Sequence, residues 1–432
     1  MTLFFLAYLI LAGLALGQAV VLGIQAWEHR RYARSCLRDL NSQRPSGRAA
    51  VFVPCKGYDV DLAENLRAVL RQDYEDYEVA FIVESSDDPA VATLRQVMAE
   101  YPQVATRLLV VGKATDSGQK VHNLRMATEL IRPEIKYLAF VDSDAGPRRE
   151  WLRVMLSRIA PREGSAKPDV CVATGYRWFL PQRPTVANHL LYSINCGVMA
   201  LLGRSSHYLV WGGCWGIRRE TFETIGLRDA WQGTLSDDMV ATRVLRQNRL
   251  RVRFEPACVV GSPLDQTLRQ TFSFLRRQYM VARFYAPLWW AFALLNATLI
   301  NLAYLGGLAV FAVGMLAGSP MAWAGVGTTV LLYGLGVFRA AVRQGLTSTY
   351  FPEQHPSFSI ARRWDMYAGP LAGLANGLAL LGSMVGRHIT WRGICYRMLP
   401  GGKIRIAWRR ETPPTKATDE PEYRDTPIRR AA

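Results

Sequence analysis

The strongest constraint in the sequence is the placement of its apolar residues, which gather at the two ends of the chain. Residues 3–27, LFFLAYLILAGLALGQAVVLGIQAW, carry no charge and are long enough to cross a bilayer, for which about 20 apolar residues suffice. Basic residues follow this run at Arg30, Arg31 and Arg34 rather than preceding it, which favours an uncleaved anchor over a signal peptide. We therefore expect residues 1–28 to form a transmembrane anchor, with the arginines on the cytosolic side.

Three further apolar stretches lie near the other end, at residues 288–316, 322–338 and 368–385. We assign residues 285–388 to C-terminal membrane helices. Basic residues between and after these stretches favour the cytosolic side, so an even number of crossings should follow the central domain. We then expect that one of the three stretches lies in the interface or re-enters the membrane, or that the longest contributes an unequal share of the crossings. A transporter would usually show many more spans.

The formal net charge of +17 could suggest a nucleic-acid partner. However, the sequence has no zinc-finger spacing, no aromatic RNA-binding motif and no separate basic domain, so we expect no nucleic acid. Arginines beside membrane spans account for much of the charge, including a basic juxtamembrane segment at 389–410. The seven cysteines include no CxxC pair, which argues against a disulfide framework or a zinc site. The Pro-rich, charged tail at 411–432 is expected to be disordered.

The central residues 48–284 read as one globular α/β domain. Short runs rich in β-branched and aromatic residues alternate with helical patterns, and this alternation predicts a parallel sheet. In such sheets, ligands bind beyond the carboxyl ends of the strands. The predicted strands cover residues 49–55, 77–84, 106–111 and 136–142, and helical patterns cover residues 61–72 and 88–101.

Acidic residues gather where two of these strands end. Glu84 and Asp87 follow the second strand, and Asp142 and Asp144 follow the fourth in the string VDSDAG. In a DxD arrangement on an extended chain both side chains point the same way, so the two carboxylates can share one divalent cation that bridges a nucleotide diphosphate. Such hard oxygen ligands suit Mg²⁺ or Mn²⁺. The spacing alone is a weak signal because it arises often by chance.

A second acidic pair, Asp237 and Asp238, precedes a predicted helix in the string GTLSDDMV. Helix capping explains one acid, because a side chain there can accept a hydrogen bond from a free backbone amide. It does not explain two. The second carboxylate becomes interesting if the fold brings it near Asp142 and Asp144.

Seven short strings occur in order along the central domain: VPCKG, SSDDPA, KVHNL, VDSDAG, WGGCWGIRRETF, GLRDAWQGTLSDDM and FLRRQYM. With these strings and the acids Asp142, Asp144, Asp237 and Asp238, the sequence resembles the inverting nucleotide-sugar glycosyltransferases of families 2 and 21, and most of all the plant-type ceramide glucosyltransferases. The end of the chain, ITWRGICYR, is also similar.

The resemblance implies a GT-A (Rossmann-like) fold, a UDP-sugar donor, Mg²⁺ or Mn²⁺, and a ceramide-like lipid acceptor reached from the cytosolic leaflet. It implies that Asp142 and Asp144 bind the metal and the diphosphate. Asp238 matches the general base, and Asp237 occupies the supporting position. The product would be a β-linked glycolipid, because a single displacement on an α-linked donor inverts the configuration.

The acidic residues after the second predicted strand match the family's pattern less cleanly, and either Glu84 or Asp87 could lie near the uracil and ribose. Lys120 is a candidate diphosphate contact. Gly213 could let the backbone approach the sugar, although paired glycines more often mark a turn. The family has a further signature, a Gln or Arg followed three residues later by Arg-Trp, and this signature is degenerate in the present sequence. Its substitutes here would be Arg276, Arg277 and Gln278, although basic residues before a membrane span also commonly face lipid headgroups.

Other functions remain open from the sequence. The acceptor could be another lipid, such as a hopanoid or diacylglycerol, and the sugar could differ from glucose. A polysaccharide synthase of the same superfamily would usually need more spans and an intact signature. A membrane scaffold with an inactive transferase domain would not need four placed acids. The expected location is a bacterial inner membrane or an internal eukaryotic membrane, with the catalytic domain facing the cytosol.

Overall fold

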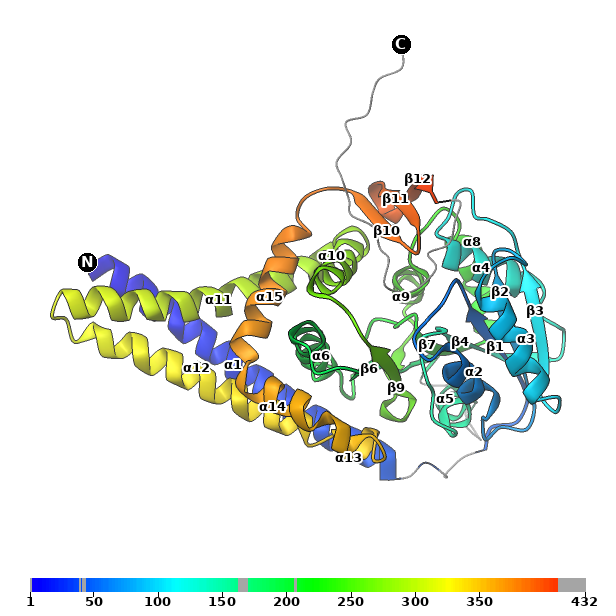
Figure 1. Cartoon of the computed structure of the whole chain (residues 1–432), viewed down its shortest axis with the longest axis horizontal. Coiled ribbons are helices and arrows are strands. Elements are labelled where there is room, and N and C mark those ends of the chain that lie inside the picture. The colour runs from blue at the N-terminus through cyan, green and yellow to red at the C-terminus, as the bar shows by residue number, and fades with distance from the viewer. Residues whose placement is uncertain (1, 39, 41–43, 162–169, 206–207, 411–432) are drawn as a thin grey trace, which may run out of the picture.

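The computed structural model describes residues 2–38, 40, 44–161, 170–205 and 208–410. A rounded part holds a β-sheet, and three long helices extend from it as a bundle (Figure 1). The bundle consists of α1 (Thr2–Arg38), α11 (Pro287–Leu316) and α12 (Met321–Gln344). The tail 411–432, for which we expect disorder, lies outside the described residues.

The central sheet has seven strands in the order β3-β2-β1-β4-β7-β5-β8. The four strands predicted from the sequence are present, and each pairs in parallel with its neighbours among them. The sheet is mixed rather than entirely parallel, because β7 runs antiparallel to both β4 and β5. The strands are β1 (Arg48–Pro54), β2 (Tyr77–Val83), β3 (Ala105–Val110), β4 (Ile135–Val141), β5 (Val172–Thr174), β7 (Cys214–Arg218) and β8 (Val252–Phe254).

Helices cover both faces of this sheet. Along β1, alternate side chains enter opposite cores, with Val51 in one and Phe52 in the other, as the two-residue repeat of a strand requires. The first core is closed by α2 (Leu62–Leu70), α3 (Ala90–Glu100) and α5 (Trp151–Ile159). The second is closed by α4 (Gln119–Glu129), α7 (Arg219–Thr224), α8 (Leu227–Ala230) and α9 (Asp237–Gln247).

A third core joins the sheet domain to the helical bundle. It contains Tyr32 of α1, Trp178 of β6 and Leu275 of α10, so α1 is packed onto the part of the chain that holds the sheet. Its elements are β6 (Arg177–Pro181), α6 (Val186–Met199), β9 (Val260–Leu264), α10 (Leu268–Tyr285), α13 (Thr347–Tyr350), α14 (Ser359–Tyr367) and α15 (Gly369–Gly382).

Among the residues that the structure describes, three helices are long and apolar enough to cross a membrane, namely those spanning Leu3–Arg38, Pro287–Leu316 and Met321–Tyr350. The third of the predicted C-terminal stretches forms α15, a shorter apolar helix over Gly369–Gly382. At 1.5 Å per residue, a helix of this length reaches only about 20 Å, which is less than the hydrocarbon core. Two long helices therefore follow the sheet domain, an even number.

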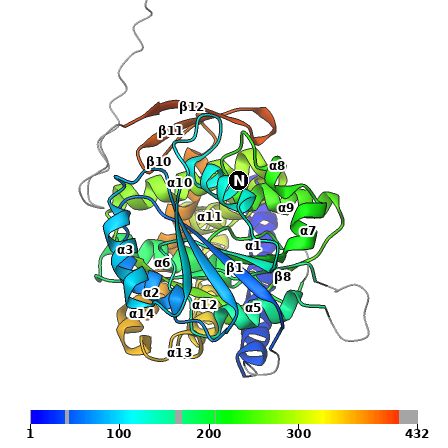
Figure 2. The ribbon, with the colours of Figure 1, turned by 90° about the vertical axis from the view of Figure 1, so that its right-hand side faces the viewer.

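The segment expected as a basic juxtamembrane stretch, 389–410, lies within a folded unit. Its strands β10 (His388–Trp391), β11 (Ile394–Met398) and β12 (Ile404–Arg409) form an antiparallel sheet. This C-terminal sheet lies across the top of the part that holds the central sheet (Figure 2) and shares a core with Leu235 and Met280. Short 3₁₀ turns complete the fold at Pro256–Cys258, His355–Phe358 and Pro400–Gly402.

Candidate active site

Three predicted site residues meet at the carboxyl edge of the sheet. Asp142 follows β4, Asp237 begins α9, and Lys120 lies in the first turn of α4. The Lys120 ammonium lies 2.7 Å from Asp142 Oδ1 and 3.2 Å from Asp237 Oδ1. It also donates a hydrogen bond of 3.1 Å to the Gly212 carbonyl. One buried cation therefore joins two acids that are far apart in the sequence.

Burial shapes the charges of this cluster. It raises the pKa of Asp237 from the ordinary 3.8 to about 7, although attraction to Lys120 opposes the shift. The pKa of Asp142 is also raised by burial, against the same opposing attraction. For Lys120, burial opposes the charge, but Asp142 and Asp237 outweigh it and raise the pKa. Lys120 therefore stays protonated at neutral pH.

Asp238 is held by hydrogen bonds of its own. Its Oδ2 accepts from the Gly212 N–H at 3.0 Å, and its Oδ1 accepts from the Met239 N–H at 2.7 Å and from the Ser236 hydroxyl. Ser236 also caps α9, because its Oγ accepts from the Met239 N–H at 3.4 Å. Capping is therefore shared by Ser236 and Asp238, whereas Asp237 contacts Lys120.

The paired glycines beside these acids have a packing role. A Cβ on Gly212 would lie 2.9 Å from Asp237 Oδ2 and 3.1 Å from Asp238 Cβ. A Cβ on Gly213 would lie 2.3 Å from the Trp211 ring. Gly213 also accepts the Asp142 N–H through its carbonyl at 3.1 Å. The pair thus lets the backbone run against both acidic regions, and the space beside Gly213 is filled by Trp211.

Asp144 faces a cation that the sequence interpretation missed. Arg177, the first residue of β6, lies 3.4 Å from Asp144 Oδ2 and 3.8 Å from Asp142 Oδ2. Its guanidinium also lies 5.0 Å from the centre of the Trp211 ring. One arginine among 52 basic residues gives no local signal of such a role.

Glu84 and Asp87, the two residues predicted to lie near the uracil and ribose, have different surroundings. Glu84 is paired with Lys56 and with Arg409 of β12, whose Nη1 lies 2.7 Å from Glu84 Oε2. Asp87 is exposed, and its backbone N–H donates to Ser85 Oγ at 3.1 Å. Glu84 is thus built into the site by partners on two sides, while Asp87 lies at its rim.

The predicted substitutes for the degenerate signature lie on α10. Arg276 donates to the carbonyls of Gly382 and Val385, at 3.0 and 2.9 Å, and so binds the end of α15. Arg277 lies over the rings of Phe274 and Trp391, at 5.3 and 5.6 Å. Gln278 is exposed. These contacts place Arg276 and Arg277 beside α15 and the C-terminal sheet rather than in the acid cluster.

The acids fit a divalent cation that is completed by a substrate. Asp142 and Asp144 offer carboxylate oxygens at one strand end, and the buried Asp144 Oδ1 has no hydrogen-bond partner. Over the described ranges, no group of three or more His, Cys, Asp and Glu side chains could hold a metal on its own. This suits Mg²⁺, which is usually bound by one or two carboxylates together with substrate phosphates.

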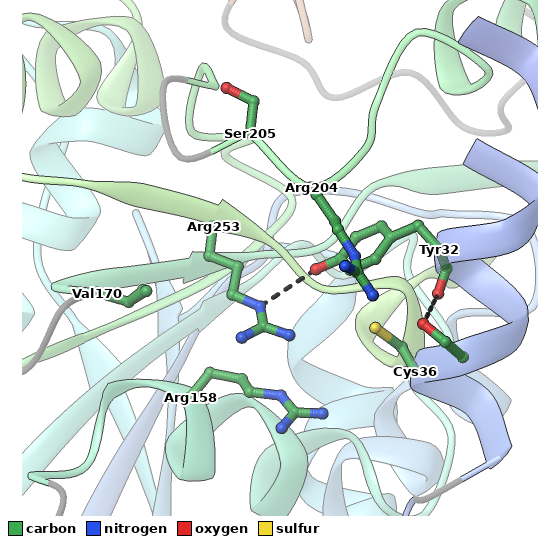
Figure 3. A pocket seen from close by; sticks show the side chains of 8 residues that line it. Tyr32, Cys36, Arg158, Val170, Arg204, Ser205 and Arg253 are labelled. Carbon is green, nitrogen blue, oxygen red and sulfur yellow. Dashed lines mark hydrogen bonds between the residues drawn. The ribbon is translucent and has the colours of Figure 1, made fainter. Parts of the chain in front are cut away.

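A cavity of about 420 Å³ lies elsewhere, between α1 and the sheet domain. Arg158, Arg204 and Arg253 point into it, and Arg253 Nε donates to Tyr32 Oη at 3.2 Å (Figure 3). None of the predicted site residues lines this cavity. The acid cluster and the cavity are therefore separate features.

A mixed α/β sheet with acids at its carboxyl edge and apolar helices at both ends is the arrangement of a membrane-bound GT-A glycosyltransferase. The profile of glycosyl transferase family 21 matches residues 12–404, and the chain belongs to this family. Family membership and the observed sheet together confirm the predicted fold class.

Among curated proteins, the chain is similar to two ceramide glucosyltransferases of Caenorhabditis elegans. It is 32% identical to ceramide glucosyltransferase 3 over 78 residues, which are 18% of this chain and 17% of that protein. It is 26% identical to ceramide glucosyltransferase 1 over 83 residues, which are 19% of this chain and 18% of that protein. The chain thus aligns with under a fifth of each relative's length.

Solved structures with similar folds are more distant in sequence. Mannosyltransferase PcManGT from Pyrobaculum calidifontis, in complex with GDP-Man and Mn²⁺, has a TM-score of 0.45 at 19% identity, over 84% of this chain and 99% of that one. Glucosyl-3-phosphoglycerate synthase from Mycobacterium tuberculosis has a TM-score of 0.34 at 13% identity, over 54% of this chain and 76% of that one.

Proposed function

We propose that this family 21 glycosyltransferase moves glucose from UDP-glucose to the hydroxyl of ceramide, with inversion to a β-glucoside. The observation that carries the proposal is the convergence of Asp142, Asp237 and Asp238 around Lys120 and Gly212 at the carboxyl edge of the sheet. The ceramide glucosyltransferases among its relatives and the apolar helices support a lipid acceptor.

Asp238 acts as the general base in this proposal. The acceptor oxygen attacks the anomeric carbon and forms the new glycosidic bond, while its proton passes to the Asp238 carboxylate. The bond from the anomeric carbon to UDP breaks, and its electron pair leaves with the diphosphate. Asp238 is only partly buried, so an acceptor can reach it, whereas Asp237 is buried behind it and paired with Lys120.

The donor is bound by the other acids. Asp142 and Asp144 hold Mg²⁺ or Mn²⁺, which when bound neutralises the diphosphate charge. Lys120 adds a fixed positive charge beside Asp142. Glu84, rather than the exposed Asp87, is the better-placed partner for the uracil and ribose, because Lys56 and Arg409 fix its orientation. The sheet domain faces the cytosol, where UDP-sugars are available.

The test is transfer by the purified full-length protein in lipid nanodiscs with UDP-glucose and Mg²⁺. Ceramide, diacylglycerol and a hopanoid with a free hydroxyl are supplied separately, and products are identified by mass spectrometry and by the NMR coupling of the anomeric proton. We expect a β-glucoside of ceramide. Transfer only to diacylglycerol or the hopanoid would refute the acceptor, an α-linked product would refute inversion, and use of another UDP-sugar alone would refute glucose.

A further inference from the structure

The tip of the C-terminal sheet has an unusual backbone. Trp391 of β10 pairs with Ile394 of β11, so Arg392 and Gly393 form a two-residue hairpin loop. Both have positive φ angles, 48° for Arg392 and 75° for Gly393. A turn with positive φ at both positions favours Asn-Gly or Gly-Gly, because a longer side chain is strained in the left-handed region. The backbone of this turn does not explain why its first residue is an arginine, so the explanation must lie in the contacts of the side chain.

The Arg392 side chain reaches into the donor side of the site. Its Nη1 donates to the Lys56 carbonyl at 2.7 Å, and its Nη2 donates to the Asp59 carboxylate. The other oxygen of Asp59, Oδ2, accepts from the Ser143 hydroxyl at 2.7 Å. Ser143 lies between Asp142 and Asp144, so two hydrogen bonds, through the Asp59 carboxylate, link the guanidinium to the proposed metal and diphosphate region.

The electrostatic environment agrees with this placement. Burial opposes the charge of Arg392, but attraction to Asp59, and to Asp144 and Asp142 beyond it, outweighs burial and raises the pKa of the guanidinium. The side chain is also 32% exposed, so it is not sealed in a core. A permanently charged, partly accessible guanidinium beside the metal-binding acids is suited to a phosphate, which it can bind through two parallel hydrogen bonds.

A purely structural role for Arg392 would be to hold the C-terminal sheet in place. Other contacts already do this. The Gln119 N–H donates to Tyr396 Oη at 3.1 Å, the Ile404 N–H donates to the Gly233 carbonyl at 3.0 Å, and Lys403 Nζ donates to the Gln232 carbonyl at 2.6 Å. These bonds fasten β11 and β12 to the starts of α4 and of the loop before Asp237. The C-terminal sheet therefore has anchors other than the arginine at its tip.

We propose that Arg392 is a catalytic residue, delivered by the C-terminal hairpin, that exchanges Asp59 for the donor's diphosphate and stabilises that diphosphate as it departs. This inference rests on the proposed function and names a residue for the same site. As the bond from the anomeric carbon to the phosphate oxygen breaks, the electron pair stays on that oxygen, and Arg392 donates hydrogen bonds to it without giving up a proton. The acceptor's proton goes to Asp238.

The test compares UDP with uridine as ligands of the full-length protein in nanodiscs with Mg²⁺, by isothermal titration calorimetry. Arg392→Gln should weaken UDP binding by at least about tenfold, the usual loss for a hydrogen bond to a charged group, and change uridine binding by less than about twofold. Arg392→Lys, which keeps the charge but not the planar fork, should recover part of the UDP affinity.

Arg405→Gln is the matched control, because Arg405 lies on β12 of the same sheet and carries the same charge but is exposed, and no donor contact is proposed for it. It should leave the ratio of UDP to uridine affinity unchanged. A ratio that also stays unchanged in Arg392→Gln would overturn the role of Arg392 while UDP binding by the wild-type protein still supports the donor. A wild-type protein that does not bind UDP would overturn both the donor and this inference. Neither readout depends on the acceptor lipid or on turnover.

Discussion

Asp237 and Asp238 are neighbours in the sequence but are held in different ways. Asp238 accepts hydrogen bonds from the Gly212 and Met239 backbones, which fix its carboxylate at the rim of the site. Asp237 is 3% exposed, pairs with Lys120 through one oxygen, and leaves its buried Oδ2 without a hydrogen bond. An oriented, accessible acid and a buried, charge-paired one can divide base and support roles between them.

Asp238→Asn tests this division. The amide keeps nearly the same volume and can still accept a hydrogen bond, but it cannot take a proton at neutral pH. We expect glycolipid formation per folded molecule to fall by about 10²–10⁴-fold, the usual contribution of a general base. UDP affinity measured on the same preparation should survive.

Asp237→Asn is the companion variant, and it should reduce turnover less than Asp238→Asn if Asp237 only supports the base. If the pair served only to cap α9, Asp238→Asn would lower stability by about 1 kcal/mol and leave turnover nearly intact. A near-normal rate for Asp238→Asn would therefore reject it as the base. A larger loss for Asp237→Asn would transfer that role to Asp237.

The raised pKa of Asp237 makes stability depend on pH. Below about pH 4 the group is protonated in both the folded and the unfolded state. Between pH 3.8 and about 7 the unfolded chain releases this proton while the folded protein keeps it, so Asp237 lowers the free energy of unfolding as pH rises through this window. Above that window its contribution is constant.

Asp237→Asn should remove this part of the pH dependence. The measurement is the slope of unfolding free energy between pH 4 and pH 7, in detergent with a chelator present, for the wild type and the variant. The slope should be less negative in the variant. Identical slopes would contradict the raised pKa.

If Asp142 and Asp144 bind the metal as we propose, transfer should depend on it. Glucose transfer should vanish in excess chelator and return with Mg²⁺ or Mn²⁺, and Asp144→Asn should raise the metal concentration needed for half-maximal rate. Uridine binding is the control and should persist without metal. Full activity in excess chelator would show that cationic side chains such as Lys120 and Arg177 neutralise the diphosphate without a metal.

The strands and the bundle helices could be predicted because their signals are local. The run AAVFVPC and the uncharged segment at 3–27 each identify an element without knowledge of the rest of the chain. The C-terminal sheet was not predicted, although the strand-like runs HITW and ICYRM flank a two-residue turn that could have revealed it. The role of its arginines depends on partners far away in the sequence, as in the pair of Arg392 and Asp59, which are 333 residues apart.

A buried network ties α12 to α14 and α6. Arg343 donates to both oxygens of Asp365, and Gln344 Nε2 donates to Asp365 Oδ2 at 2.6 Å. The Tyr192 hydroxyl then donates to Gln344 Oε1 at 2.6 Å. Asp365 and Arg343 are almost fully buried, with side chains 0% and 9% exposed. The network therefore holds the long helix and the shorter interface helices in one arrangement.

Asp365→Asn should destabilise this junction, because it leaves the Arg343 charge buried without its counter-ion. Breaking one partner of a buried pair typically costs about 3–5 kcal/mol. Thermal unfolding of the detergent-solubilised protein measures the change. The double variant Arg343→Met, Asp365→Leu is the control and should recover much of the loss, since no unpaired charge remains. A single variant as stable as the wild type would show that the pair is not needed.

The whole molecule places its catalytic part at one end of a three-helix bundle. The N-terminal end of α1 and the connection between α11 and α12 both lie at the end of the bundle far from the sheet (Figure 1). Because α1 is followed by basic residues and then by the sheet domain, the positive-inside rule leads us to propose that this domain faces the cytosol. If α11 and α12 both cross the membrane, they return the chain to the side of the sheet domain, where α14, α15 and the C-terminal sheet pack on it.

Cysteine labelling tests this topology with little background, because all seven native cysteines are buried. Ala317→Cys places an exposed thiol between α11 and α12, and Ala99→Cys places one on α3 of the sheet domain. In sealed vesicles with their cytosolic face outward, a membrane-impermeant maleimide should label Ala99→Cys at once and Ala317→Cys only after permeabilisation. The reverse pattern would put the catalytic part on the non-cytosolic side, away from cytosolic UDP-sugars. Immediate labelling at both positions would show that α11 and α12 do not cross the membrane.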